Sequence, residues 1–251
     1  AERGEVMAVA DDDILLRCAH AGKRYGTRRV LQDITLEVRE GEVHALVGLN
    51  GAGKTTLMRL LLGMVRADTG AVRVAGCDPS VMEARHWAGV GHLVEVPLAY
   101  PELTVTQNLS IAGRLAGLSR PAAARAATRW AEEFALTGWA RSRARTLSLG
   151  NRQRVGLAAA WIADPRILIL DEPTNALDPA GIMIVRTLLK RSRETGAAAL
   201  VSSHHLDEVA RVADRITVMN GGRLIGMLDP TGIDLERQFF DLIYADSQAR
   251  P

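Results

Sequence analysis

A glycine-rich loop between a predicted strand and a predicted helix constrains the fold of this chain of 251 residues most strongly. Residues 48–55 read Gly-Leu-Asn-Gly-Ala-Gly-Lys-Thr, which fits the pattern G-x-x-x-x-G-K-[ST]. The mostly apolar run Val43–Val47 before it predicts a buried strand, and Lys54–Val65 after it carries apolar residues at helical spacing. Glycines let the backbone turn its N–H groups inward, and a helix N-terminus adds partial positive charge. The loop is therefore predicted to cradle phosphate.

The side chains of this loop have distinct expected parts in holding a nucleoside triphosphate. We expect Lys54 to reach the β- and γ-phosphates and the Thr55 hydroxyl to bind Mg²⁺. The simpler interpretation, a glycine-rich turn before a helix, is disfavoured because strand, loop and helix follow in the order that a phosphate loop requires. The nucleotide-binding candidates here are Gly48, Asn50, Gly51, Gly53, Lys54, Thr55 and Thr56.

A second apolar run ends in two carboxylates. Ile167–Leu170 predicts a buried strand, and Asp171 and Glu172 follow it directly. Charged strand ends are common, but a phosphate loop needs a metal-binding acid on a neighbouring strand. We expect Asp171 to hold Mg²⁺ through its water shell, and Glu172 to orient and deprotonate the attacking water.

Strands and helices alternate along most of the chain. The further predicted strands are Ile14–Cys18, Ile34–Val38, Ala71–Ala75, Ala198–Ser202, Ile216–Met219 and Arg223–Met227, the last two forming a hairpin at Gly221-Gly222. The further predicted helices cover residues 151–163, 179–194, 206–213 and 235–243. This α/β alternation predicts a mostly parallel sheet covered by helices on both faces. Residues 96–150 carry only helix patterns, at Val105–Leu118 and Pro121–Leu136, and are predicted to form an inserted helical subdomain.

Composition narrows the class of protein. Hydrophobic residues make up 47% and charged residues 24%, the range of globular domains. The 31 basic and 29 acidic residues nearly cancel, so we expect no nucleic-acid partner. No apolar run approaches the ~18 residues of a membrane span. Cys18 and Cys77 lack metal-type spacing, which is typical of a reducing compartment, and residues 1–12 are expected to be a flexible tail or vector-derived.

Taken in order, these segments resemble the ATP-binding cassette of ABC transporters, from about residue 14 to residue 230. The remaining matches are Tyr25 at the adenine-stacking position, Glu95 at the Q-loop position, Leu147–Arg154 as the signature motif, Asn175–Asp178 as the D-loop and Ser202–His204 as the switch-histidine segment. The resemblance implies a P-loop NTPase fold with a RecA-like core, an N-terminal antiparallel β subdomain and an inserted α-helical subdomain. The cassette would span residues 13–230, with a short C-terminal helix within 231–251.

The resemblance also implies roles for single residues. Tyr25 would stack on adenine, although a lone tyrosine is often a packed edge residue. Ser148 and Gly150, at a helix start, would offer N–H groups to the γ-phosphate bound by an opposing subunit. Asp178 would bridge to that subunit, and His204 would contact the γ-phosphate. The implied active unit is a head-to-tail pair with a second cassette, either a homodimer or a close paralogue.

Two departures from the common pattern point to a subset of the family. Glu95 replaces the usual glutamine, where we expect it to keep a metal-sensing role, and Leu149 and Asn151 alter the signature. Together with the stretch Val94–Tyr100, they resemble exporters of the bacitracin and lantibiotic type. That subset implies an ATPase that powers export of a drug, antibiotic or peptide through an integral membrane permease. The chain would then be cytoplasmic, on the inner face of the membrane.

Three other functions stay open at this point. A subunit of an ABC importer would carry the same ATP site. A soluble ABC protein acting on nucleic acid or the ribosome usually has two cassettes or basic tails, neither of which the sequence predicts. A degenerate regulator is disfavoured because Lys54, Asp171, Glu172 and His204 are all present. The apolar surface near Pro97, Leu98 and Tyr100 is where family members receive a helix of the membrane partner, although ordinary packing between lobes is the simpler explanation.

Overall fold

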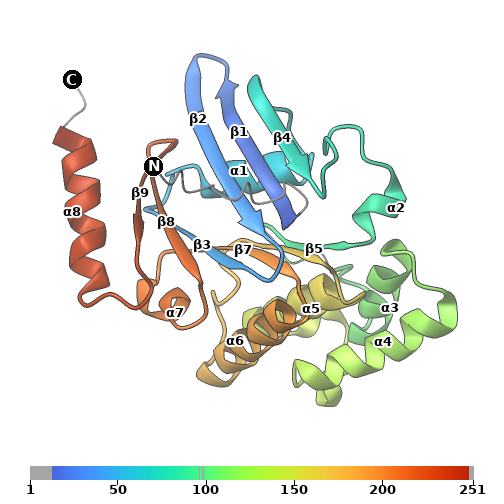
Figure 1. The fold of residues 1–251 in the computed structure, drawn as a ribbon. Coiled ribbons are helices and arrows are strands. Elements are labelled where there is room, and N and C mark those ends of the chain that lie inside the picture. Colours follow the sequence, from blue (N-terminus) through green and yellow to red (C-terminus); the bar gives the residue numbers. More distant parts are fainter. Residues whose placement is uncertain (1–12, 96, 98, 249–251) are drawn as a thin grey trace, which may run out of the picture.

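Two sheets organise the chain, for which the computed structural model describes residues 13–95, 97 and 99–248 (Figure 1). The first sheet is antiparallel, with strand order β2-β1-β4. Its strands are β1 (Ile14–Tyr25), β2 (Arg28–Arg39) and β4 (Thr69–Val74). The antiparallel N-terminal sheet is as predicted. The predicted tail of residues 1–12 and the predicted surface residue Leu98 lie outside the described residues.

The second sheet forms the core and has the strand order β5-β6-β7-β3-β8-β9. Its strands are β3 (Val43–Val47), β5 (Val90–Leu93), β6 (Ile167–Leu170), β7 (Ala198–Ser203), β8 (Arg215–Asn220) and β9 (Arg223–Leu228). All pair in parallel except β9, which forms the predicted hairpin with β8. The mostly parallel sheet is therefore confirmed, and β5 was not predicted.

Both faces of the core sheet are buried. Alternate residues of a strand point to opposite faces, and β6 divides accordingly: Leu168 and Leu170 join the cluster with the helical segment, whereas Ile167 and Ile169 pack with α1 (Lys54–Leu61). The α1 cluster also contains residues of the antiparallel sheet, so this helix fills the space between the two sheets. The continuous apolar run of β6 follows from this two-sided burial.

Four helices between residues 105 and 194 cover the face of the core sheet that is opposite α1 (Figure 1). They are α3 (Val105–Leu115), α4 (Arg120–Glu133), α5 (Leu149–Trp161) and α6 (Pro179–Glu194), with 3-10 turns at Thr137–Trp139 and Ala144–Thr146. A capping box of Thr104 and Gln107 opens α3. Trp130, Phe134 and Trp161 join α4 to α5, with ring centroids 5.9–6.5 Å apart.

Three further helices complete the described fold: α2 (Ala84–Trp87), α7 (Leu206–Ala210) and α8 (Leu235–Gln248). The last one lies beside the β8–β9 hairpin at the edge of the molecule (Figure 1). Its residue Asp246 accepts hydrogen bonds from Arg223 and Asn220. Within the described residues, no helix has both the length and the apolar character that a membrane crossing needs.

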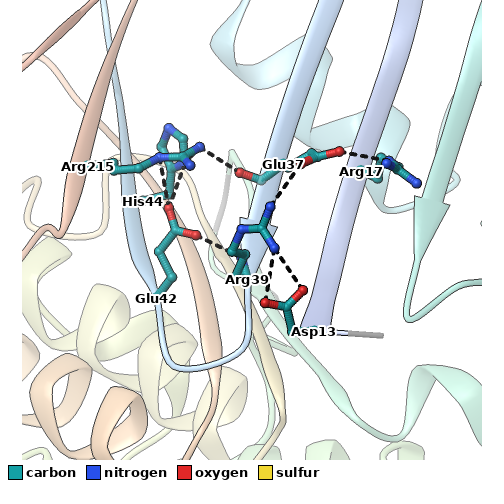
Figure 2. Close-up of polar contacts among 7 residues, drawn as sticks. All are labelled: Asp13, Arg17, Glu37, Arg39, Glu42, His44 and Arg215. Atoms are coloured by element: carbon teal, nitrogen blue, oxygen red, sulfur yellow. Dashed lines mark hydrogen bonds and ion pairs between the residues drawn. The ribbon is translucent and has the colours of Figure 1, made fainter. Parts of the chain in front are cut away.

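A polar network around the buried side chains of Glu42 and His44 ties the end of the antiparallel sheet to the core sheet (Figure 2). Glu42 lies at its centre, where Oε2 accepts a hydrogen bond of 2.8 Å from the Arg39 backbone N–H. Its Oε1 lies 3.2 Å from His44 Nδ1 and 3.1 Å from Arg215 Nε. Arg215 in turn donates to the Glu37 carbonyl at 2.9 Å. Strands β2, β3 and β8 therefore meet through one carboxylate.

Glu42 is predicted to stabilise the fold in a pH-dependent manner. Burial raises the pKa of this carboxyl, but hydrogen bonds from His44 and from the Arg39 backbone, with the charges of His44 and Arg215, outweigh burial and leave the pKa below its ordinary value. Leaving buried hydrogen-bonding groups unsatisfied costs about 1–3 kcal/mol, so Glu42→Gln should lower the free energy of unfolding at pH 7 by about that amount.

The stabilisation should be complete above the pKa of an unfolded glutamate, about 4.3, and lost as the pH falls through the lower folded-state value. Urea unfolding between pH 7 and pH 3 measures this effect, with the exposed Glu132→Gln as the matched control. A Glu42→Gln variant as stable as the control at pH 7 contradicts the prediction.

Candidate functional site

The glycine-rich loop has the backbone shape that a phosphate cradle requires. Gly51 and Gly53 have φ angles of +80° and +114°, which favour glycine. A Cβ atom at Gly48 would lie 2.3 Å from the Met219 carbonyl oxygen, and one at Gly53 would lie 2.8 Å from Met219 Cε. At Gly51, by contrast, a Cβ would meet no atom within 4 Å. The loop therefore packs on β8 on one side and leaves its other side open.

Lys54 begins α1 and is buried inside this loop. Its Nζ donates a hydrogen bond of 2.7 Å to the Gly48 carbonyl, with Leu49 O at 3.5 Å. Glu172 Oε1 lies 3.5 Å from the same nitrogen. A lysine ammonium is a compact point charge that suits phosphate oxygens, and here it lies between the loop carbonyls and the Glu172 carboxylate.

Three polar side chains meet where β6 and β7 end. Asp171 Oδ2 accepts a hydrogen bond of 2.6 Å from the Thr55 hydroxyl, and Asp171 Oδ1 accepts one of 2.5 Å from the Ser202 hydroxyl. The Ser202 oxygen also accepts a hydrogen bond of 2.8 Å from the Glu172 N–H. The sequence predicts Ser202 only as part of the switch-histidine segment, because its bridging position depends on the adjacency of β6 and β7.

The donor set at Thr55 and Asp171 fits Mg²⁺. In the part of the chain that the structure describes, no group of three or more His, Cys, Asp or Glu side chains could hold a metal ion. Mg²⁺ bound with a nucleotide takes one or two protein oxygens and completes its shell with phosphate oxygens and water. A hydroxyl and a carboxylate 2.6 Å apart supply oxygens of that kind.

Glu172 adopts a left-handed backbone conformation, with φ of +47°. This conformation is uncommon for a residue other than glycine and is often found at functional sites. Its Oε2 lies 2.8 Å from His204 Nδ1 and accepts a weaker hydrogen bond of 3.3 Å from the His204 N–H. The side chain is 18% exposed, so the carboxylate faces Lys54 and His204 while keeping access to solvent.

A second group of candidate residues lies around the start of α5. Ser148 caps α5 by accepting a hydrogen bond of 3.2 Å from the Asn151 N–H. A Cβ at Gly150 would lie 2.7 Å from the Ala176 carbonyl oxygen, so the signature segment packs tightly on residues 175–178. Asp178 caps α6 and accepts hydrogen bonds from the Gly181 N–H and the Arg154 guanidinium.

Arg154 holds this second group together, a role that its place in the signature motif does not predict. Its guanidinium donates to Asp178 at 2.5 Å and to the Phe134 carbonyl at 3.1 Å. The hydrogen bond from Arg154 holds the pKa of Asp178 below its ordinary value. Among the described residues, the contacts of Ser148, Gly150 and Asp178 run within this group and not to Lys54 or Glu172.

The other candidates lie at the edges of the site. Tyr25 ends β1 with 45% of its surface exposed, and Lys23 Nζ lies 5.6 Å from its ring centroid. Asn50 is exposed in the loop, and Thr56 is half-buried on α1. Glu95, two residues after β5, forms an ion pair with Arg59 of α1. In this structure the carboxylate of Glu95 is therefore bound by Arg59, a partner that the sequence did not indicate.

Comparisons with known proteins agree with this geometry. A family model described as ABC transporter matches residues 31–175. The bacitracin transport ATP-binding protein BcrA of Enterococcus faecalis is 39% identical over 205 residues, which cover 81% of this chain and 65% of that protein. The lantibiotic transport ATP-binding protein SrtF of Streptococcus pyogenes is 33% identical and aligns over 84% of this chain and 89% of its own length.

A solved structure of an ATP-binding subunit of an ABC transporter superposes with a TM-score of 0.84. It is 28% identical and covers 91% of this chain and 99% of its own. The cassette fold inferred from the motifs is thus confirmed. On the family match, the sequence identity and the shared fold, this chain belongs to the ABC transporter ATP-binding family.

Proposed function

We propose that the chain binds and hydrolyses ATP to power export of a drug, antibiotic or peptide through a separate membrane permease. The observation that carries the ATPase part is the junction of Glu172 with Lys54 and His204, next to Thr55 and Asp171. The names of the bacitracin and lantibiotic relatives support the kind of cargo. The proposal assigns the cassette to residues 13–230, with a helical subdomain at about 96–150 and a short C-terminal helix.

In this proposal the phosphate loop binds the triphosphate. Backbone N–H groups from Gly48 to Thr56 surround the phosphate oxygens, and Lys54 leaves the loop carbonyls to donate to them. Thr55 and Asp171 would hold Mg²⁺, with Glu95 as a further ligand once it leaves Arg59, and the ion would supply positive charge against the phosphate oxygens. Tyr25 stacks on adenine through its exposed ring.

Glu172 acts as the general base for the attacking water. A carboxylate within hydrogen-bond reach of a water can take its proton as the new bond to phosphorus forms. His204 holds this carboxylate through the 2.8 Å contact and adds a donor to the γ-phosphate. The positive φ of Glu172 aims the carboxylate at the end of the phosphate loop.

A second cassette completes each site in the proposed active unit. Ser148 and Gly150 start α5, where free N–H groups and the helix dipole favour an anion. Their packing against residues 175–178 lets Asp178 and the signature segment move together. The partner is either an identical chain or a close paralogue, and nucleic acid is not a partner.

The proposed site for the permease is an apolar groove between the core sheet and the helical segment. It has a volume of about 500 Å³ and is lined by residues of β5, α3 and α5, among them Leu93, Leu115 and Gly156. Through this contact the chain would sit at the cytoplasmic face of the membrane. Leu115, which lines it, is 70% exposed, so an apolar helix of a partner would find a matching surface.

Reconstitution with the membrane protein encoded by the adjacent gene tests the export proposal. The two proteins should co-purify, and cargo should stimulate ATP hydrolysis several-fold in vesicles and move away from the ATP-binding side. Cargo movement toward that side would instead assign the chain to an importer. A purified pair that hydrolyses ATP but moves no drug, antibiotic or peptide contradicts the export proposal while leaving the ATPase proposal intact.

A further inference from the structure

Helix α1 presents two polar side chains one turn apart to the ends of two neighbouring strands. Thr55 and Arg59 are spaced i, i+4 and therefore lie on the same helix face. Thr55 binds Asp171 after β6, and Arg59 binds Glu95 after β5. The two contacts therefore lie on successive turns of α1.

The pairing of β5 with β6 fixes the positions of the two carboxylates relative to each other. The strands are parallel, with Leu93 opposite Leu170, and the Asp171 N–H donates a hydrogen bond of 2.7 Å to the Leu93 carbonyl. Glu95 is therefore only two residues beyond Leu93, whose carbonyl contacts the Asp171 backbone. One turn of α1 advances about 5.4 Å, so the Arg59–Glu95 pair lies about one helix turn from the Thr55–Asp171 contact.

The Arg59–Glu95 ion pair has no net charge, and little free energy is needed to separate its side chains. The side chains of Arg59 and Glu95 are 33% and 47% exposed. Ion pairs this accessible to water contribute little to stability, because solvent screens the attraction. Alone, Glu95 would add a full negative charge one turn of α1 from the Thr55–Asp171 contact. Paired with Arg59, it adds almost none.

We propose that Arg59 is a positioning residue that holds and neutralises Glu95, and thereby sets how strongly nucleotide binding depends on a divalent cation. This inference rests on the proposed ATP site. With Arg59 present, the site accepts the triphosphate without repulsion from Glu95. Without it, Glu95 repels the metal-free triphosphate and attracts Mg²⁺ instead.

A double-mutant cycle read by ATP binding tests this role. The probe is a fluorescent ATP analogue, titrated with EDTA and again over a range of Mg²⁺ concentrations. Because a water-accessible negative charge near the triphosphate repels it only weakly, we expect Arg59→Ala to weaken metal-free binding about two- to fourfold. The Mg²⁺ concentration for half-maximal binding should fall by a similar factor. Glu95→Gln should shift both quantities in the opposite direction.

The double variant and the conservative variant separate a positioning role from a structural one. Arg59→Ala/Glu95→Gln should return both quantities to near wild type, and Arg59→Lys should behave as wild type. A double variant that keeps the weakened metal-free binding of Arg59→Ala overturns the inference, as does an Arg59→Lys variant that behaves like Arg59→Ala. Failure of the wild-type chain to bind the ATP analogue at all would instead overturn the proposed function.

Discussion

Replacing Glu172 with glutamine is expected to lower the rate of ATP hydrolysis about 100- to 10,000-fold, the usual contribution of a positioned general base. The amide keeps the size of the side chain and can still contact His204, whose Nδ1 lies 2.8 Å from Oε2 in the wild type. It has no basic oxygen to take a proton from water. Affinity for ATP should stay near wild type or rise, because the substitution removes a negative charge 3.5 Å from Lys54 Nζ.

Phosphate release at saturating Mg²⁺ and ATP, with a binding titration on the same preparation, measures both quantities. Glu194→Gln is the matched control, since this glutamate is exposed on the last turn of α6. A further expected result is that ATP drives the Glu172→Gln variant into a stable pair of cassettes, because the bound nucleotide persists. A Glu172→Gln variant that hydrolyses ATP at the rate of the control contradicts the assignment of the base.

Replacing Lys54 with alanine is expected to weaken ATP binding by at least 10- to 100-fold. Hydrogen bonds to charged groups contribute about 1.5–3 kcal/mol each, and Lys54 is the buried cation of the phosphate loop. The substitution also leaves Glu172 without the ammonium 3.5 Å away, which adds repulsion toward the phosphates. Hydrolysis should be lost together with binding, in contrast to the Glu172→Gln variant.

Isothermal titration with ATP and Mg²⁺ measures the loss, and the exposed Lys190→Ala serves as the control. Thermal unfolding of both variants checks that the fold survives. We expect this for Lys54→Ala because Gly48 and Leu49 offer only carbonyl oxygens, which water can satisfy in place of the ammonium. Wild-type affinity in the Lys54→Ala variant would contradict the assignment of residues 48–55 as the loop that binds the phosphates.

The local part of the site was predictable from the sequence, because the phosphate loop and the Asp171-Glu172 pair are contiguous motifs flanked by a strand or a helix. Contacts that depend on strand order were not. Ser202 joins Asp171 to Glu172 only because β7 lies next to β6. Arg59 reaches Glu95 only because β5 lies on the other side of β6.

The fold was predictable where hydrophobic periodicity is regular. β6 and α6 were predicted with their observed bounds, whereas β1 was predicted to end at Cys18 and continues to Tyr25. Register shifts after Cys18 interrupt its alternation, and His20 has a φ of +53°. β5 was missed because it is four residues long and contains Gly91, whose missing Cβ lets α5 approach: a Cβ there would lie 2.0 Å from the Ala160 carbonyl.

Single-turnover hydrolysis tests most directly the central claim that ATP bound at the phosphate loop is cleaved with Glu172 as the base. An excess of protein is mixed with ATP and Mg²⁺, and bound ADP and ATP are quantified over time for the wild type and Glu172→Gln. We expect both proteins to bind all of the ATP and only the wild type to convert it to ADP. Conversion at equal rates in the two proteins would contradict the role of Glu172 as the base.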